Sequence, residues 1–165
     1  MLKHTKGNLL DLAEQGQFNV IVQGCNCQNT MASGIAKEIR ERYPETYNKD
    51  TYWDSVASNP MGSDRIWKLG NYTELTVVAP KTANVFVIVN AYTQFNYLPR
   101  GIDHFEYESF KLILRKLSKI YSDKNFGFPY IGMGLAGGDK SRIVPMIEDF
   151  AKSLNGGTAT LVEFA

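Results

Sequence analysis

Short apolar runs alternate along this chain with longer stretches in which apolar residues recur every three or four positions. Runs of about four to eight residues are typical of strands, whereas the wider spacing indicates helices that bury one face. The clearest helix carries Phe110, Ile113, Leu114, Leu117 and Tyr121 at helical spacing. The pattern predicts strands over residues 1–6, 19–23, 65–69, 75–78, 85–90, 126–131 and 158–164. It predicts helices over residues 34–43, 46–53, 103–121 and 143–154, the last with its cap near Ser141.

Helices that separate strands point to a sheet with helices on both faces. The runs at 19–23 and 85–90 are apolar at nearly every position, which is typical of strands buried on both sides. Segments 65–69 and 75–78 flank Gly-Asn-Tyr-Thr and are predicted to form a hairpin, which would add an antiparallel pair. No repeat, low-complexity tract or linker interrupts the pattern. The prediction is therefore an α/β protein, a three-layer α/β/α sandwich with a central mixed sheet, in which residues 1–165 form a single domain.

Composition narrows the range of partners. Of the 165 residues, 44% are hydrophobic and 21% are charged, as in ordinary globular proteins. Eighteen basic residues against 17 acidic ones give a formal charge of +1, which indicates no basic surface for nucleic acid or an anionic membrane. The N-terminus shows no signal peptide, and the apolar runs are too short to span a bilayer. We therefore expect a cytoplasmic monomer that binds neither membranes nor nucleic acid directly.

The two cysteines and two histidines do not form a metal site in the sequence. Cys25 and Cys27 are separated by one residue, a spacing at which a disulfide would be badly strained. His4 and His104 show no metal-ligand spacing with the cysteines. We therefore expect both thiols to be reduced packing residues, and the protein to need no metal and no cofactor.

Two glycine-bearing loops follow predicted central strands. The first glycine loop spans residues 23–36 and the second spans residues 131–139 (Ile-Gly-Met-Gly-Leu-Ala-Gly-Gly-Asp). In open α/β sheets, ligands bind beyond the carboxyl ends of strands, where glycines let backbone N–H groups approach an anion. The alternative is that the glycines only form tight turns. Neither Gly-Lys-Ser/Thr nor the dinucleotide-binding glycine spacing is present, so the loops indicate a diphosphate ligand outside those two folds.

Three motifs stand out along the chain: Lys6-Gly-Asn-Leu-Leu; Val20-Ile-Val-Gln-Gly-Cys-Asn-Cys-Gln-Asn with Ser33-Gly-Ile-Ala and Arg42-Tyr-Pro; and Pro129-Tyr-Ile-Gly-Met-Gly-Leu-Ala-Gly-Gly-Asp. In this order they resemble the motifs of macro domains. The first follows the first strand, the second covers the first glycine loop, and the third covers the second glycine loop. The second is similar to the stand-alone ADP-ribose-1''-phosphate phosphatases, and the third is also shared with ADP-ribosyl hydrolases. The resemblance implies ADP-ribose or ADP-ribose-1''-phosphate as the ligand, and ADP-ribosylated macromolecules as further candidate partners.

The resemblance assigns ligand contacts to individual positions. Asn8 stands where most relatives carry an acid that recognises the adenine amino group, and its carbonyl oxygen can accept the same hydrogen bond; the alternative is a turn residue. Asn26 matches the asparagine that faces the distal ribose. Phe164 would either flank the adenine or pack in the core. The implied ligand-binding residues are Asn8, Leu9, Gly24, Cys25, Ser33, Gly34, Ile35, Gln94, Gly132, Met133, Gly134, Leu135, Ala136 and Gly137.

The implied catalytic residues are Asn26 and Asp139, which would align a water with the reacting atom. Asp139 would alternatively cap the next helix, and His104 is a lesser candidate that also fits a surface histidine. Gln94 occupies the position of the lysine in lysine-dependent ADP-ribosyl hydrolases, and glutamine cannot form the covalent intermediate that a lysine amine forms. Asn90 and Gln94 are candidates to bind the terminal ribose or phosphate.

Three functions stay open at this point. The first is a metal-free phosphatase acting on ADP-ribose-1''-phosphate, which the second motif favours. The second is the removal of ADP-ribose from modified targets, which Gly137-Gly-Asp139 favours and Gln94 opposes. The third is a module that binds ADP-ribose without catalysis.

Overall fold

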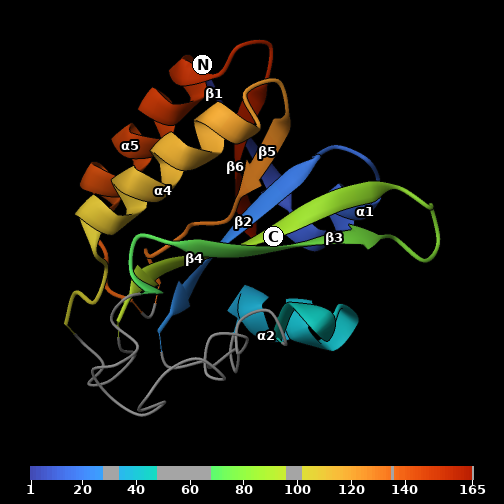
Figure 1. The fold of residues 1–165 in the computed structure, drawn as a ribbon, viewed down its shortest axis with the longest axis horizontal. Helices are drawn as coiled ribbons and strands as arrows, with labels where there is room; N and C mark the ends of the chain where they lie inside the picture. The colour runs from blue at the N-terminus through green and yellow to red at the C-terminus, as the bar shows by residue number, and fades with distance from the viewer. Residues whose placement is uncertain (28–33, 48–67, 96–101, 135, 165) are drawn as a thin grey trace.

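A computed structural model describes residues 1–27, 34–47, 68–95, 102–134 and 136–164 of the chain. They form a six-stranded sheet in the order β1–β6–β5–β2–β4–β3 (Figure 1). Neighbouring strands are parallel except β3 and β4, which are antiparallel, so the predicted mixed sheet is confirmed. The strands are β1 (Leu2–Gly7), β2 (Val20–Asn26), β3 (Tyr72–Val78), β4 (Val85–Gln94), β5 (Asn125–Phe128) and β6 (Thr158–Phe164).

Helices cover both faces of this sheet. One face carries α4 (Tyr107–Ile120) and α5 (Lys140–Ser153), which lie side by side in Figure 1, and the other carries α1 (Leu9–Glu14) and α2 (Gly34–Arg42). Because side chains alternate across a strand, β2 contributes to a core on each side. Val20 and Val22 join the cluster beneath α4 and α5, whereas Ile21 joins the cluster beneath α1 and α2. The predicted α/β/α layers are confirmed.

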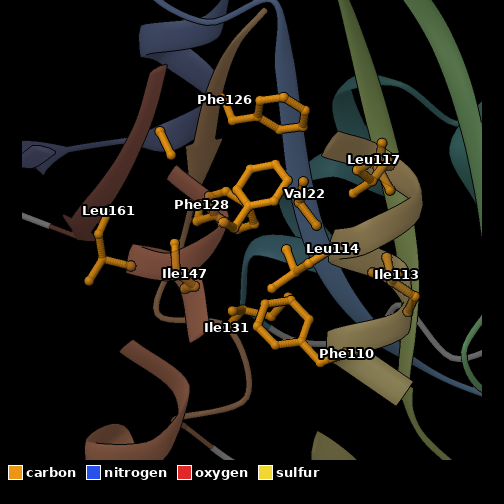
Figure 2. Close-up of a cluster of buried hydrophobic side chains, with 14 of the residues drawn as sticks. Val22, Phe110, Ile113, Leu114, Leu117, Phe126, Phe128, Ile131, Ile147 and Leu161 are labelled. Atoms are coloured by element: carbon orange, nitrogen blue, oxygen red, sulfur yellow. The ribbon is translucent and has the colours of Figure 1, made fainter. Parts of the chain in front are cut away.

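Aromatic side chains fill the core beneath α4 and α5 (Figure 2). The rings of Phe126 and Phe128 on β5 both meet the edge of Phe150 on α5, with centroids 4.8 and 5.5 Å apart. Leu114 and Leu117 of α4 point into the same cluster (Figure 2). This packing fixes α4 and α5 against β5, and with them the loop that joins β5 to α5.

The predicted hairpin between residues 65–69 and 75–78 is wrong. Lys68 and Leu69 lie in a turn, while residues 65–67 lie outside the described ranges. The antiparallel partner of β3 is β4, and the hairpin turn is the segment that joins them: Ala79 N–H donates to Asn84 O at 2.8 Å, and Ala83 has a φ of 62°. The polar segment between β3 and β4 is followed by the most apolar strand of the chain. This is the stronger signal for a hairpin, because a buried strand is the better pairing partner for β3.

Several element boundaries also differ from the prediction. The pattern misses α1, because six residues are too few to show a helical repeat. Strand β5 ends at Phe128 rather than at 131, since Pro129 has no N–H group for the ladder. Helix α4 begins at Tyr107 rather than at 103. Most of the predicted helix 46–53 lies outside the described residues. No helix in the described ranges is long and apolar enough to cross a bilayer.

Candidate functional site

The carboxyl ends of β2, β4 and β5 meet at one edge of the sheet, because these strands are parallel. We call this the carboxyl edge. The second glycine loop leaves β5 there and leads into α5, while the first glycine loop leaves β2 and leads into α2. Helix α2 begins at Gly34, whose φ is 59° and whose surroundings are open. Ser33 and Leu135 fall outside the described residues, so the structure does not place them.

Two glycines allow the second glycine loop to lie directly on the segment before α4. A Cβ atom on Gly132 would lie 2.2 Å from Cδ1 of Phe105, and one on Gly137 would lie 2.6 Å from the carbonyl oxygen of Ile102. Both glycines have a φ of 74°, a conformation that other residues adopt at a cost. Any side chain at either position would therefore push the loop away from its support.

Hydrogen bonds tie the same segment to the loop and to the sheet. His104 N–H donates to Ala136 O at 2.7 Å, and Glu106 N–H donates to Thr93 O on β4 at 2.7 Å. These bonds explain why the chain before Tyr107 is extended rather than helical. The second glycine loop is thus anchored to β4 through residues 102–106.

The second glycine loop also presents unused backbone donors. The N–H groups of Gly137 and Gly138 are used within the loop, by Gly134 O at 3.0 Å and Gly132 O at 2.7 Å. In the described part of the chain, the N–H groups of Gly132, Gly134 and Ala136 have no hydrogen-bond partner. Gly134 is exposed, and no atom lies within 4 Å of the place its Cβ would take. Unused N–H groups just before the N-terminus of a helix are donors that an anion can use.

Met133 contributes differently from its neighbours in the loop. Its N–H group donates to Tyr130 O at 3.1 Å, and its half-buried side chain packs against the core beneath α4 and α5. Met133 therefore holds the loop down rather than presenting a donor to a ligand.

Asp139 ends the second glycine loop as the N-cap of α5. Its Oδ1 accepts hydrogen bonds from Ser141 N–H at 2.9 Å and from Ser141 Oγ at 2.7 Å. These bonds to Ser141, together with the charge of Arg142, hold the pKa of Asp139 below its usual value. The carboxylate is fully ionised at neutral pH, and its Oδ2 makes no hydrogen bond to the described residues. The capping alternative is confirmed, and it leaves one carboxylate oxygen for a ligand or a water.

Asn26 and Gln94 lie opposite each other at the ends of β2 and β4. Asn26 is 9% exposed, and Cys27 N–H donates to Gln94 O at 3.0 Å. The register shifts just before Asn26, so that Thr93 has no residue opposite it. The Thr93 hydroxyl is buried and has no hydrogen-bond partner among the described residues. The bulge thus places a third polar residue, Thr93, at the end of β4, and the sequence pattern did not single it out.

Gly24 and Cys25 precede Asn26 on β2. A Cβ on Gly24 would lie 3.0 Å from both Ile131 and Thr93, so the absence of a side chain lets the second glycine loop approach β2. Cys25 and Cys27 are buried beside Tyr92 and form no disulfide, as predicted. Because the Cys25 side chain is buried, a ligand would meet its backbone only.

Asn8 and Leu9 follow β1 at the same edge. Asn8 Oδ1 accepts from Asp11 N–H at 2.9 Å as the N-cap of α1, and its Nδ2 donates to Glu38 Oε1 at 2.9 Å. Leu9 is buried in the core beneath α1 and α2, and Ile35 packs against that core from α2. The structure therefore gives Asn8 a capping role, while leaving its carbonyl oxygen a second lone pair.

Phe164 is not part of the core. Its side chain is 78% exposed, and it pairs in register with Gly7, the residue before Asn8. The core alternative is therefore wrong. An exposed aromatic ring stands instead at the carboxyl end of β6, next to the predicted adenine position.

Comparisons with known proteins bear on the fold. No family model matches the sequence. A 17.5 kDa protein in the tk-vs intergenic region of Enterobacteria phage T4 is 27% identical over 161 residues, which are 93% of this chain and 92% of that protein. The ADP-ribose 1''-phosphate phosphatase of Candida albicans is 24% identical over 119 residues, 72% of this chain and 69% of the phosphatase. The macrodomain of Mycobacterium tuberculosis DarG matches the structure with a TM-score of 0.72 and 17% identity, over 98% of this chain and 97% of the other. The chain has the macrodomain fold.

The macrodomain resemblance inferred from three sequence motifs is thus confirmed for the fold. One predicted ligand residue, however, lies away from the surface of the protein. Asn90 is 1% exposed and belongs to a buried network: its Oδ1 accepts from Gln23 Nε2 at 2.7 Å, and its Nδ2 donates to Thr46 O at 3.1 Å. The structure gives Asn90 a role within the fold rather than at a ligand.

Sequence reasoning missed the residues that support the second glycine loop. Tyr107 Oη accepts from Asp139 N–H at 2.9 Å and donates to Asp103 Oδ2 at 2.5 Å. Asp103 and Tyr107 are four positions apart within the predicted helix 103–121, and that spacing alone did not mark them as part of the site. Among the described residues, no group of three or more His, Cys, Asp or Glu side chains is placed to hold a metal.

Proposed function

We propose that this macrodomain binds ADP-ribose at the carboxyl edge and hydrolyses the terminal phosphate of ADP-ribose-1''-phosphate without a metal. The observation that carries the proposal is the second glycine loop, whose N–H groups at Gly132, Gly134 and Ala136 have no partner in the described chain. A diphosphate requires several such donors at one place. The Candida albicans relative, an ADP-ribose 1''-phosphate phosphatase, supports both the ligand and the reaction.

The strand order suggests how the ligand lies. Strands β1 and β6 are on one side of β5, and β2 and β4 are on the other. With the diphosphate at the loop after β5, the adenine extends toward Asn8 and Phe164. The distal ribose extends toward Asn26 and Gln94. This orientation agrees with the roles that the resemblance assigned to Asn8 and Asn26.

The reaction is the hydrolysis of the phosphate ester at the 1'' oxygen of the distal ribose. Water attacks the terminal phosphorus, the bond between phosphorus and the ribose 1'' oxygen breaks, and that oxygen takes up a proton, giving ADP-ribose and inorganic phosphate. Asp139, ionised and with a free Oδ2, would accept a hydrogen bond from the attacking water. Asn26 would hold the distal end. Catalysis of this kind rests on positioning and on stabilising the phosphate charge with fixed donors.

The other two functions make different predictions for Asp139. Removal of ADP-ribose from modified targets, suggested by the Gly137-Gly-Asp139 motif, should be abolished by Asp139→Ala. If the protein is a phosphatase, Asp139→Ala should weaken or spare its activity. If it only binds ADP-ribose, Asp139→Ala should leave the binding nearly intact. Asp139→Asn is the control, because asparagine is also a favourable N-cap and removes only the charge.

A charge placed in the second glycine loop tests the binding proposal. Gly134 lies in open space and its φ is outside the left-handed region, so a side chain there should not disturb the fold. Gly134→Glu adds a negative charge beside the diphosphate and should weaken ADP-ribose binding by about tenfold or more, whereas the neutral Gly134→Gln should weaken it much less. Equal affinities for the two variants would show that no anion binds at this loop.

The phosphatase proposal is tested by phosphate release from ADP-ribose-1''-phosphate. We expect the wild-type protein to release phosphate at the same rate with and without EDTA, and Gly134→Glu to release it more slowly than Gly134→Gln. If the protein binds ADP-ribose tightly but releases no phosphate, only the binding part of the proposal would stand. A rate that EDTA abolishes would contradict the metal-free reaction.

A further inference from the structure

Tyr107 lies at the junction of three segments around the second glycine loop. Its hydroxyl links the segment before α4 to the end of the loop, and its ring contacts Arg142 in the first turn of α5. We propose that Tyr107 is a positioning residue, which fixes Asp139 and the second glycine loop in the arrangement that binds the distal part of the ligand. This inference rests on the proposed function, and its test separates the two.

Both hydrogen-bonding capacities of the Tyr107 hydroxyl are used. Asp139 N–H donates to Tyr107 Oη at 2.9 Å, and the hydroxyl donates to Asp103 Oδ2 at 2.5 Å. The directions are fixed, because a backbone N–H group can only donate and a carboxylate can only accept. The other oxygen of Asp103 accepts from Phe105 N–H at 2.9 Å, so Asp103 is itself held in place.

Two contacts also hold the ring of Tyr107 in place. The guanidinium of Arg142 lies over the ring, 3.6 Å from its centroid, and Phe105 meets the ring edge to face at 5.1 Å. Arg142 comes from the first turn of α5, three residues after Asp139. Burial, and then the hydrogen bond to Asp103, raise the pKa of Tyr107, so the hydroxyl keeps its proton at neutral pH.

Three contacts attach the second glycine loop to residues 104–107, and the contact of Tyr107 is one of them. Gly132 rests on Phe105, Ala136 O accepts from His104 N–H, and Asp139 N–H donates to Tyr107. The first two fix the beginning and middle of the loop. The third fixes its end, where Asp139 carries the free carboxylate oxygen. Without it, Asp139 would be held only from the α5 side, by the bonds of its side chain to Ser141 and of its carbonyl oxygen to the N–H groups of Arg142 and Ile143.

The role is one of position rather than of overall stability. Asp139 is exposed, so water can replace the lost hydroxyl as the acceptor for its N–H group. Tyr107→Phe also keeps the ring, and with it the contacts of Arg142 and Phe105. We therefore expect this variant to unfold at nearly the same temperature as the wild type, while its loop is held less firmly.

The test compares Tyr107→Phe with Tyr121→Phe. Tyr121 closes the opposite end of α4, and its hydroxyl donates to Glu74, so the control also removes one hydroxyl–carboxylate bond from the same helix. Affinities for ADP-ribose and for AMP are measured by calorimetry, together with the melting temperature. We expect Tyr107→Phe to weaken ADP-ribose binding by about threefold to tenfold, as for the loss of a hydrogen bond, with AMP binding unchanged. Tyr121→Phe should leave both affinities as in the wild type.

The comparison with AMP distinguishes positioning from damage to the fold. A general loosening would weaken both ligands and lower the melting temperature, and that result would overturn the inference. Wild-type affinity of Tyr107→Phe for ADP-ribose would also overturn it, while leaving the proposed function intact. Failure of the wild type itself to bind ADP-ribose would reject the proposed function and this inference together. Asp103→Asn, which keeps an acceptor for the hydroxyl but removes its charge, should give a smaller loss in the same direction.

Discussion

The packing of the second glycine loop predicts a large difference between two alanine substitutions in that loop. Gly137→Ala places a methyl group 2.6 Å from Ile102 O, at a φ of 74°. The left-handed conformation costs about 1 to 2 kcal/mol for a residue other than glycine. Moving the loop to relieve the contact would also weaken the bond between His104 and Ala136, worth about 1 kcal/mol. Together these terms predict a loss of about 2 to 3 kcal/mol in the free energy of unfolding.

Gly134→Ala is the matched control, because it adds the same methyl group to the same loop. Its position is open and not left-handed, so the free energy of unfolding should change by less than about 0.5 kcal/mol. Urea unfolding of both variants and of the wild type measures the difference directly. If the two variants are equally stable, the second glycine loop does not rest on the segment before α4.

Three further predictions concern other parts of the site. Asn8→Ala removes the N-cap of α1 and should lower the free energy of unfolding by about 1 kcal/mol in urea unfolding; no change would mean that the cap contributes nothing. Phe164→Ala should leave the melting temperature unchanged, because the ring is exposed, yet weaken ADP-ribose binding by about fivefold. Ile120→Ala, at another exposed apolar side chain, is its control and should not affect binding. Because the pKa of Asp139 is lowered on folding, its capping contribution is complete above the ordinary value of 3.8 and is lost as the pH falls through the lower folded value. An NMR titration should therefore place its midpoint below 3.8, and phosphate release should show no Asp139-dependent change from about pH 5 to about pH 8; a midpoint above 3.8 would contradict the capping geometry.

The strands and long helices were predictable because their apolar patterns are determined by burial. Strand β6 has the predicted bounds, and α2 and the centre of α4 lie where the periodicity placed them. Predictions failed where a contact distant in the sequence decides the local structure. The start of α4 is such a case, since residues 102–106 are kept extended by bonds to β4 and to the second glycine loop. The mistaken hairpin is another, because the choice between two turns depended on which strand β3 would pair with.

The candidate site was predicted as a set of loops rather than as a set of contacts. The glycine spacing of residues 131–139 correctly indicated a loop at the carboxyl edge, since strand direction alone determines where that loop lies. The sequence could not show which of its N–H groups are used internally, because that depends on the turns at Gly132 and Gly137. Nor could it show that Tyr107 supports Asp139, since the two are 32 positions apart in the chain.

Calorimetric titration of the wild-type protein with ADP-ribose, AMP and ADP tests the central claim most directly. The free donors of the second glycine loop, with Asn26 and Asp139 beyond them, predict one ADP-ribose bound per chain with micromolar affinity, clearly tighter than ADP. Affinity for ADP-ribose no greater than that for ADP would contradict a site for the distal ribose. No binding of any of the three would mean that the chain keeps the macrodomain fold without its ligand site.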